Sequence, residues 1–284
     1  MKNSKLIILV LFTLAAVTSC APTYTRETMV DGVIGMCKKE YGVDVEVKVE
    51  GKTLGVRIPL EGLFDKETLQ PTPEAFKKVD GVMLSVSRVV LSSDKSIDFH
   101  TVITYDKGVP GVELVITRYA KDLRRFVYGD ISRGEFTKRM FYDLRYNPQG
   151  IIDAWLGAFT LKEVKPGDFI IDQATRRITE EFRDNEMLIG KFKLAACEGN
   201  LEAGRLKFTV DITREGLPMS ELIHGKAWHD QVLELCLQKI SYTVHAYNFK
   251  DYEVIEVFNK FDNNRVEIGK NEINRWRKKG VKID

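Results

Sequence analysis

VDVEVKVEGKTLGVRIPL, residues 43–60, is the stretch that decides the fold. Apolar residues alternate with charged ones before the turn Glu50–Thr53, and they recur at every second position after it. Period-two alternation on both sides of a glycine-containing turn is typical of a β-hairpin. Because the first strand has one apolar and one charged face, we expect an antiparallel sheet with one solvated face.

Helical spacing flanks this hairpin on both sides. Apolar residues from Glu27 to Tyr41 form one stripe, and Gly42 ends the expected helix. After the hairpin, Thr72-Pro73-Glu74 has the features of a helix start, an N-cap followed by a first-turn proline and an acid, and the helix should run to about Leu91.

A second hairpin and two more helices complete the first half. The elements expected there are strands at 97–105 and 112–116, a helix at 118–127, and a helix that begins with a capping box at Ser132 and Glu135.

The second half repeats this order of elements. Its expected elements are a helix that follows Pro166-Gly167-Asp168 and bears Ile170 to Phe182, strands at 188–196 and 206–212, a helix at 225–245, strands at 252–258 and 266–268, and a helix at 271–279. Strand 54–60 corresponds to 206–212, and Asp106-Lys107 corresponds to Asn259-Lys260. The sequence therefore predicts an α+β fold with antiparallel β-hairpins, helices packed on one face, and a duplicated helix–hairpin–helix–hairpin–helix unit. Hairpins repeated without common origin remain the alternative.

The expected domain organisation follows from these patterns. It comprises a signal peptide (1–19), a lipidated tether (20–25), a first α+β half (26–146), a connecting segment (147–165) and a second α+β half (166–284).

The N-terminal segment has the pattern of an export signal. Lys2 and Lys5 precede the 12-residue apolar run 6–17, which would span about 18 Å as a helix, less than a bilayer core of about 30 Å. Val17-Thr18-Ser19-Cys20 closes the run and resembles the lipobox of bacterial prolipoproteins. An ordinary secretory signal with an incidental cysteine is the alternative.

The resemblance to prolipoproteins implies a compartment and an anchor. Cys20 would carry a diacylglycerol and an N-acyl chain, and the mature protein would be anchored to the membrane of the cell envelope. Ala21, which is not aspartate, implies the periplasmic face of the outer membrane in an organism with two membranes. Residues 21–25 reach about 17 Å when extended, so the folded part should sit near the bilayer.

Composition disfavours nucleic acid as a partner. The formal net charge of +2 equals the charge of Lys2 and Lys5, so the mature chain would be neutral, whereas nucleic-acid binders are strongly basic.

The sequence contains no recognised catalytic, cofactor-binding or metal-ligating pattern. Ser92-Ser93-Asp94-Lys95 matches the Ser-x-x-Lys nucleophile motif but lacks its companion motifs, and we interpret it as a turn. The histidines, which lack a carboxylate–histidine pattern, are interpreted as surface or helix-end residues. They are His100, His224, His229 and His245. At most one disulfide can form among Cys37, Cys197 and Cys236, and their spacing does not say which.

Two stretches combine basic and aromatic residues and are the best candidate surfaces. The first spans Arg118–Arg145 and the second Lys270–Asp284. Such surfaces bind phosphate head groups, anionic glycans or carboxylates of a partner, although solvated helix faces have the same composition. The candidate residues are Arg118, Lys121, Arg124, Arg125, Arg139, Arg275, Arg277 and Lys278.

These observations favour a non-enzymatic envelope lipoprotein that binds or assembles with a partner protein, glycan or lipid. The alternatives are a carrier of a small apolar or lipid-like ligand and an envelope hydrolase with an unrecognised site. The sequence leaves the ligand and the oligomeric state open.

Overall fold

The structure, a computed structural model, describes residues 23–278 apart from 66, 69, 95–96, 110, 150, 153–158 and 217–225. The expected signal peptide and Cys20 lie outside the described residues. The chain divides into two compact units, Met1–Glu163 and Val164–Asp284. The boundary between them falls inside the predicted connecting segment 147–165.

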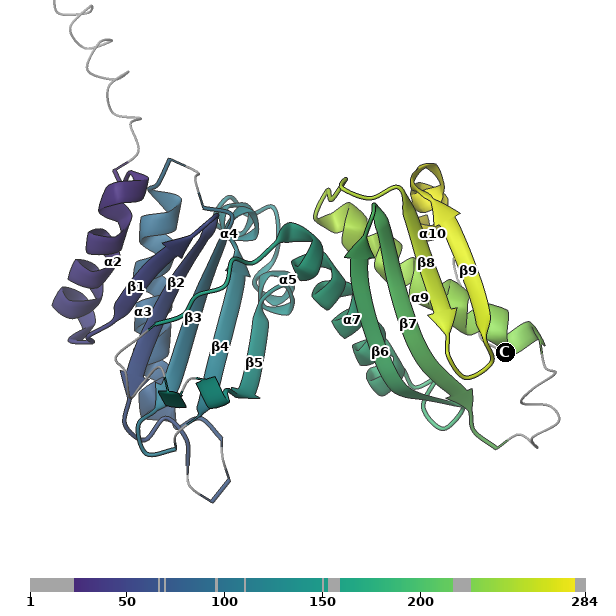
Figure 1. The fold of residues 1–284 in the computed structure, drawn as a ribbon, viewed down its shortest axis with the longest axis horizontal. Helices are drawn as coiled ribbons and strands as arrows, with labels where there is room; N and C mark the ends of the chain where they lie inside the picture. Colours follow the sequence, from purple (N-terminus) through teal and green to yellow (C-terminus); the bar gives the residue numbers. More distant parts are fainter. Residues whose placement is uncertain are drawn as a thin grey trace, which may run out of the picture. The chain divides into compact units, whose positions relative to one another are not determined.

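The first unit is a five-stranded sheet with helices on one face (Figure 1). Its elements are α2 (Arg26–Tyr41), β1 (Glu46–Glu50), β2 (Thr53–Leu60), α3 (Pro73–Leu91), β3 (Phe99–Asp106), β4 (Val112–Tyr119), α4 (Ala120–Val127), α5 (Arg133–Lys138) and β5 (Phe141–Tyr146). The strands lie in the order β1-β2-β3-β4-β5.

The second unit repeats this order of elements around a four-stranded sheet. Its elements are α7 (Pro166–Asp184), β6 (Phe192–Glu202), β7 (Arg205–Arg214), α9 (Lys226–Ala246), β8 (Val254–Asn259), β9 (Asn264–Gly269), a 3₁₀ turn (Lys270–Glu272) and α10 (Ile273–Lys278). The strand order is β6-β7-β8-β9. The predicted strand 188–196 was wrong in position, because β6 begins at Phe192 and the buried Leu188 lies in the preceding turn.

The α+β class and the four antiparallel hairpins are confirmed, and each sheet also contains one parallel pair that the sequence analysis did not anticipate. The hairpins β1–β2, β3–β4, β6–β7 and β8–β9 are antiparallel, whereas β2–β3 and β7–β8 are parallel. A helix connects the two strands of each parallel pair. Such a crossover returns the chain to the edge where the first strand began, so the second strand runs in the same direction.

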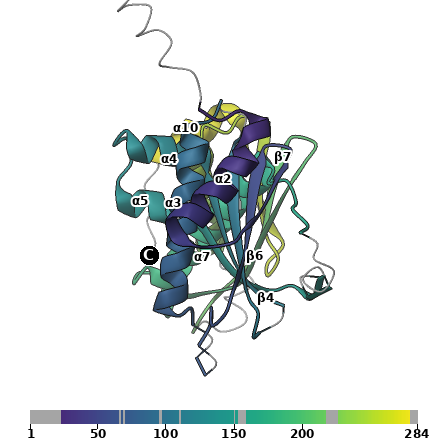
Figure 2. The ribbon, with the colours of Figure 1, turned by 90° about the vertical axis from the view of Figure 1, so that its left-hand side faces the viewer.

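The main core of the first unit lies between the sheet and helices α2 and α3 (Figure 2). Val33 of α2, Val82 of α3, and Val56 and Val102 of the central strands are fully buried there. Gly42, at φ +64°, ends α2 in the left-handed conformation that glycine adopts without strain. Thr72 precedes α3 as predicted, but its hydroxyl donates to Gly62 O instead of capping the helix.

The second face of this sheet is partly covered, which corrects the expectation of a solvated face. Residues 159–163 run along it without regular structure, and Phe159 packs with Ile103 and Val115. Leu161 lies over Gly55, where a Cβ would approach its Cδ1 to 2.5 Å. Lys52 N–H donates to Glu163 Oε1 at 2.8 Å. Both faces of the central strands are therefore buried.

Candidate binding surface of the first unit

Helix α4 lies beside the point where the described chain begins. The backbone N–H groups of Thr23 and Tyr24 donate to Ser92 O, at 2.9 and 3.2 Å, just after the C-terminus of α3. Arg124 of α4 donates to Val90 O at 3.5 Å, in the last turn of the same helix. The tether and α4 thus meet the same end of α3.

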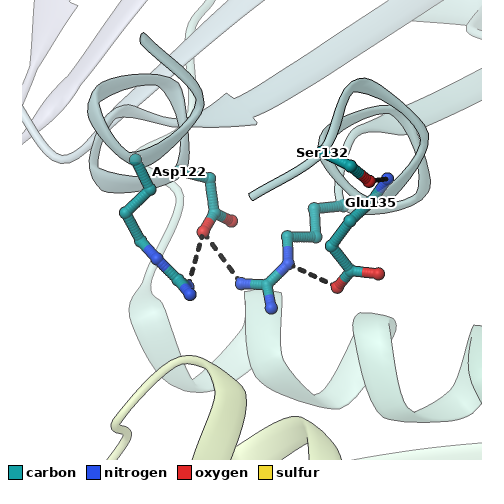
Figure 3. Close-up of polar contacts among 5 residues, drawn as sticks. Asp122, Ser132 and Glu135 are labelled. Atoms are coloured by element: carbon teal, nitrogen blue, oxygen red, sulfur yellow. Dashed lines mark hydrogen bonds and ion pairs between the residues drawn. The ribbon is translucent and has the colours of Figure 1, made fainter. Parts of the chain in front are cut away.

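A buried charge network joins α4 to α5 (Figure 3). Asp122 Oδ1 accepts from Arg139 Nη1 at 2.9 Å, and Arg139 Nε donates to Glu135 Oε1 at 2.7 Å. Arg125 pairs with Asp122 at 3.6 Å. Burial raises the pKa of Asp122 above its ordinary value, although Arg139 and Arg125 oppose that effect. The predicted capping box is confirmed on its N-cap side, since Ser132 Oγ accepts from Glu135 N–H at 3.1 Å.

Of the predicted surface arginines, Arg139 is buried and Arg118 is partly buried. Arg139 is enclosed by the network just described. Arg118 lies over the Phe136 ring, 5.4 Å from its centroid, and burial lowers the pKa of its guanidinium. Arg139 therefore joins α4 to α5 and Arg118 packs α5 against β4, so both side chains have structural contacts and are weaker candidates for a binding face.

The exposed part of α4 and α5 is basic and ends in two large apolar residues. Lys121 is exposed, and Arg124 and Arg125 are partly exposed. Val127 and Tyr128, at the C-terminus of α4, are 58% and 79% exposed. Arg133 and Lys138 of α5, which sequence reasoning did not single out, are also exposed. In α4, the helical period of 120–127 places buried Leu123 on a different face from the exposed basic residues, and this pattern would have identified the outer face.

Strand β5 was missed in the sequence. It pairs with β4 through Leu114↔Leu144 and Glu113↔Arg145. Its helix-side residues Tyr142, Leu144 and Tyr146 are 40%, 52% and 66% exposed. The alternation of Phe141–Tyr146 is the signal that would have revealed it.

The second predicted basic stretch belongs to the second unit. Arg275 and Lys278 of α10 are exposed, and Arg277 is partly buried. The structure therefore divides the eight predicted residues between the two units, with Arg118, Lys121, Arg124, Arg125 and Arg139 in the first.

The prediction of surface histidines is wrong for two of the four. His100 is fully buried on the helix side of β3, and burial together with Arg118 lowers the pKa of His100 to about 3. His229 is buried and its Nδ1 contacts Asp262 Oδ2, so a carboxylate–histidine pair exists that the sequence spacing did not reveal. His245 is exposed, and His224 lies outside the described residues.

A small polar cavity lies on the second face of the first sheet. Arg57, Glu113, Arg145, Asn147 and Phe159 contribute to its lining, and its volume is about 20 Å³. Glu113 accepts from Arg145 at 3.2 Å and from Asn147 at 3.1 Å. A cavity of this size accommodates about one water molecule, whereas ligand sites occupy about 300–1,000 Å³. It does not match the pocket that a lipid carrier needs.

The described residues contain no group of three metal-ligating side chains, and their helices include none long and apolar enough to cross a membrane. Cys37, Cys197 and Cys236 are free thiols, and burial raises the pKa of Cys197 to about 11. The comparisons with known proteins add no relative: no family model, no curated protein and no solved structure matches the chain.

Proposed function

We propose that the chain is a lipid-anchored cell-envelope protein of the binding or assembly type, and that its first unit faces anionic phospholipid head groups through α4. The observation that carries the proposal is the attachment of Thr23 and Arg124 to the same end of α3. Cys20 lies three residues before Thr23, a distance of at most about 11 Å in an extended chain. An acylated Cys20 would therefore hold α4 near the head groups.

The chemistry of α4 suits that position. Lys121 and Arg124 are one turn apart on the same helix, and each cation near an anionic surface contributes about 1 kcal/mol. Tyr128 combines an aromatic ring with a hydroxyl, the type of side chain that sits at the boundary between head groups and acyl chains. These contributions are too small for stable attachment alone, but they would orient a protein already held by acyl chains.

Vesicle binding by the chain from Ala21 to Asp284, which lacks the lipid, tests the proposal. We expect it to sediment with vesicles of phosphatidylcholine and phosphatidylglycerol more than with phosphatidylcholine alone. The variant Lys121→Gln/Arg124→Gln should bind the anionic vesicles about 30-fold more weakly, since two cations at about 1 kcal/mol each are lost. Tyr128→Ser should weaken binding further.

The matched control removes the same charge elsewhere in the unit. Lys77 and Lys78 are exposed in the first turns of α3, at the end opposite to Val90. Lys77→Gln/Lys78→Gln should leave vesicle binding nearly unchanged. Equal losses in both double variants, or equal binding to neutral and anionic vesicles, would contradict the proposed role of α4.

The anchor is tested separately in cells. Cys20→Ala should move the exported protein from the membrane fraction to the soluble fraction. If this variant stayed membrane-bound to the same extent, the lipoprotein assignment would be wrong.

A further inference from the structure

Strand β5 forms one edge of the first sheet, and among the described residues no strand pairs with its outer side. Exposed sheet edges present free backbone N–H and C=O groups that readily pair with another strand. The side chains of β5 favour such pairing, because Tyr142, Leu144 and Tyr146 form an exposed apolar row on one face. Asp143 and Arg145 occupy the other face.

Two of the other sheet edges have protective features that β5 lacks. Strand β1 carries Glu46, Lys48 and Glu50 on one face, and these repeated charges oppose pairing. Strand β6 has a bulge between Leu194 and Ala196, and bulges disrupt edge pairing. The β4–β5 register, in contrast, runs without a shift.

The sequence of β5 is complementary to itself in the antiparallel direction. When two copies are aligned about Leu144, each Tyr142 lies opposite Tyr146 of the other copy and each Asp143 lies opposite Arg145. Aromatic pairs and opposite charges are the cross-strand pairs that stabilise antiparallel sheets. We propose that two copies of this chain associate through β5 with Leu144 on the twofold axis, joining their first sheets into one continuous sheet.

The neighbouring strand extends this complementarity. Arg145 contacts Glu113 of β4 at 3.2 Å, and its guanidinium is partly exposed, so it also has room for Asp143 of the second copy. Leu114 pairs with Leu144 across β4–β5. The apolar row would therefore continue as Leu114, Leu144 and the same two residues of the second copy. A twofold interface of this kind uses the same patch on both copies and closes at a dimer.

The dimer does not depend on the lipid anchor, so it can be tested with the chain from Ala21 to Asp284. We expect the weight-average mass in analytical ultracentrifugation to rise with concentration toward that of a dimer. Leu144→Lys places like charges on the axis and should give a monomer. Leu84→Lys is the matched control, because Leu84 of α3 is 50% exposed and Leu144 is 52% exposed. This variant should dimerise like the wild-type chain.

Cysteine cross-linking tests the register itself. Under mild oxidation, Leu144→Cys should form a disulfide-linked dimer. Tyr142→Cys alone and Tyr146→Cys alone should not, because each residue would be offset by four residues, about 14 Å, from its counterpart, beyond the roughly 7 Å limit for a disulfide. A mixture of the two tyrosine variants should form the heterodimer.

Three results would overturn the proposal. The first is a wild-type chain that stays monomeric over the whole concentration range. This result would count against the dimer even if a strand of another protein were found to bind β5. The second is cross-linking of Leu144→Cys no faster than that of Tyr142→Cys. The third is an equal loss of dimer in Leu84→Lys and Leu144→Lys. The wild-type chain, in which Cys37, Cys197 and Cys236 are retained, provides the background rate.

Discussion

The two units of the molecule share a scaffold but differ in what is added to it. Lys52 O accepts the N–H groups of Asp98 and Phe99 where β3 begins, and Gly204 O accepts those of Glu253 and Val254 where β8 begins. The same hydrogen bonds thus start the parallel pair in each unit. Agreement at this level, together with the same order of elements, supports the duplication predicted from the sequence.

At the end of the third strand, the two units have different side chains at equivalent positions, a carboxylate in the first unit and an amide in the second. Asp106 accepts from Phe64 N–H at 3.0 Å and from Gly108 N–H at 2.7 Å. At the equivalent position, Asn259 accepts from Ile212 N–H at 3.0 Å and donates to Ile212 O at 3.2 Å. A carboxylate only accepts, whereas an amide accepts and donates. The backbone groups that need a hydrogen-bond partner therefore determine which side chain is suitable at this position.

The additions distinguish the first unit. Among the described residues, the first unit adds the fifth strand β5, the buried network of Asp122, Arg139 and Glu135 between α4 and α5, and the segment 159–163 across its second face. In the second unit that face carries charged pairs such as Arg205–Glu256, at 3.4 Å. A scaffold of this kind supports many unrelated functions, so the elements added to it are a better guide to the function of the first unit. Three predictions test whether the two units differ as this comparison implies.

The largest expected effect is a loss of stability of the first unit in acid. The pKa of His100 is about 3 in the folded unit and about 6.5 in the unfolded chain. As the pH falls below 6.5 the unfolded chain binds a proton first, so the free energy of unfolding falls by up to about 1.4 kcal/mol per pH unit until about pH 3. The total is about 4 to 5 kcal/mol.

Hydrogen exchange in peptides from β3 and β4, corrected for intrinsic rates, measures this effect. His100→Leu should remove the part of the pH dependence of the free energy of unfolding that comes from binding of one proton. It should retain stability at pH 7, since Leu has a similar volume and leaves no buried nitrogen unsatisfied. His245→Gln, at an exposed position of the second unit, is the control and should change nothing. An unchanged pH dependence in His100→Leu would show that another group is responsible.

The next effect concerns the network of Figure 3. Asp122→Ala should destabilise the α4–α5 segment by about 3 kcal/mol, because it leaves the buried Arg139 with Glu135 as its remaining carboxylate. Exchange protection in α4 and α5 should fall about 100-fold while the second unit stays unchanged. Asp130→Ala removes an exposed acid from the same connection and should have little effect. Equal effects of the two variants would mean that the network contributes nothing.

The sequence predicts the order of helices and hairpins because local periodicity sets it. It does not predict the burial of His100, because the alternation of β3 places His100 opposite Phe99 and Ile103, and only the folded structure shows that helices cover the face on which His100 lies. Arg139 was assigned to a surface for a similar reason. Its partner Asp122 is 17 residues earlier, and no helical spacing connects the two.

The candidate site was located only in part. Lys121 and Arg124 were found from the mixture of basic and aromatic residues, and both are at least partly exposed. Strand β5 was missed because Arg118–Arg145 was treated as one basic stretch, which concealed the alternation of residues Phe141–Tyr146 at its end. An edge strand is recognisable as an edge only when the strand order is known.

The smallest expected effect comes from exchanging the two side chains at the strand ends, Asp106 and Asn259. Asn259→Asp removes the donor to Ile212 O and places a negative charge beside that carbonyl, so β7 and β8 should lose about 2 kcal/mol. Asp106→Asn keeps one acceptor and loses one of two hydrogen bonds, at a cost of about 1 kcal/mol in β2 and β3. Exchange protection measured separately in each unit should show both losses, the larger one in the second unit. If either exchange were neutral, the backbone groups would not determine the residue at this position, and the match between Asp106 and Asn259 would be weaker support for duplication.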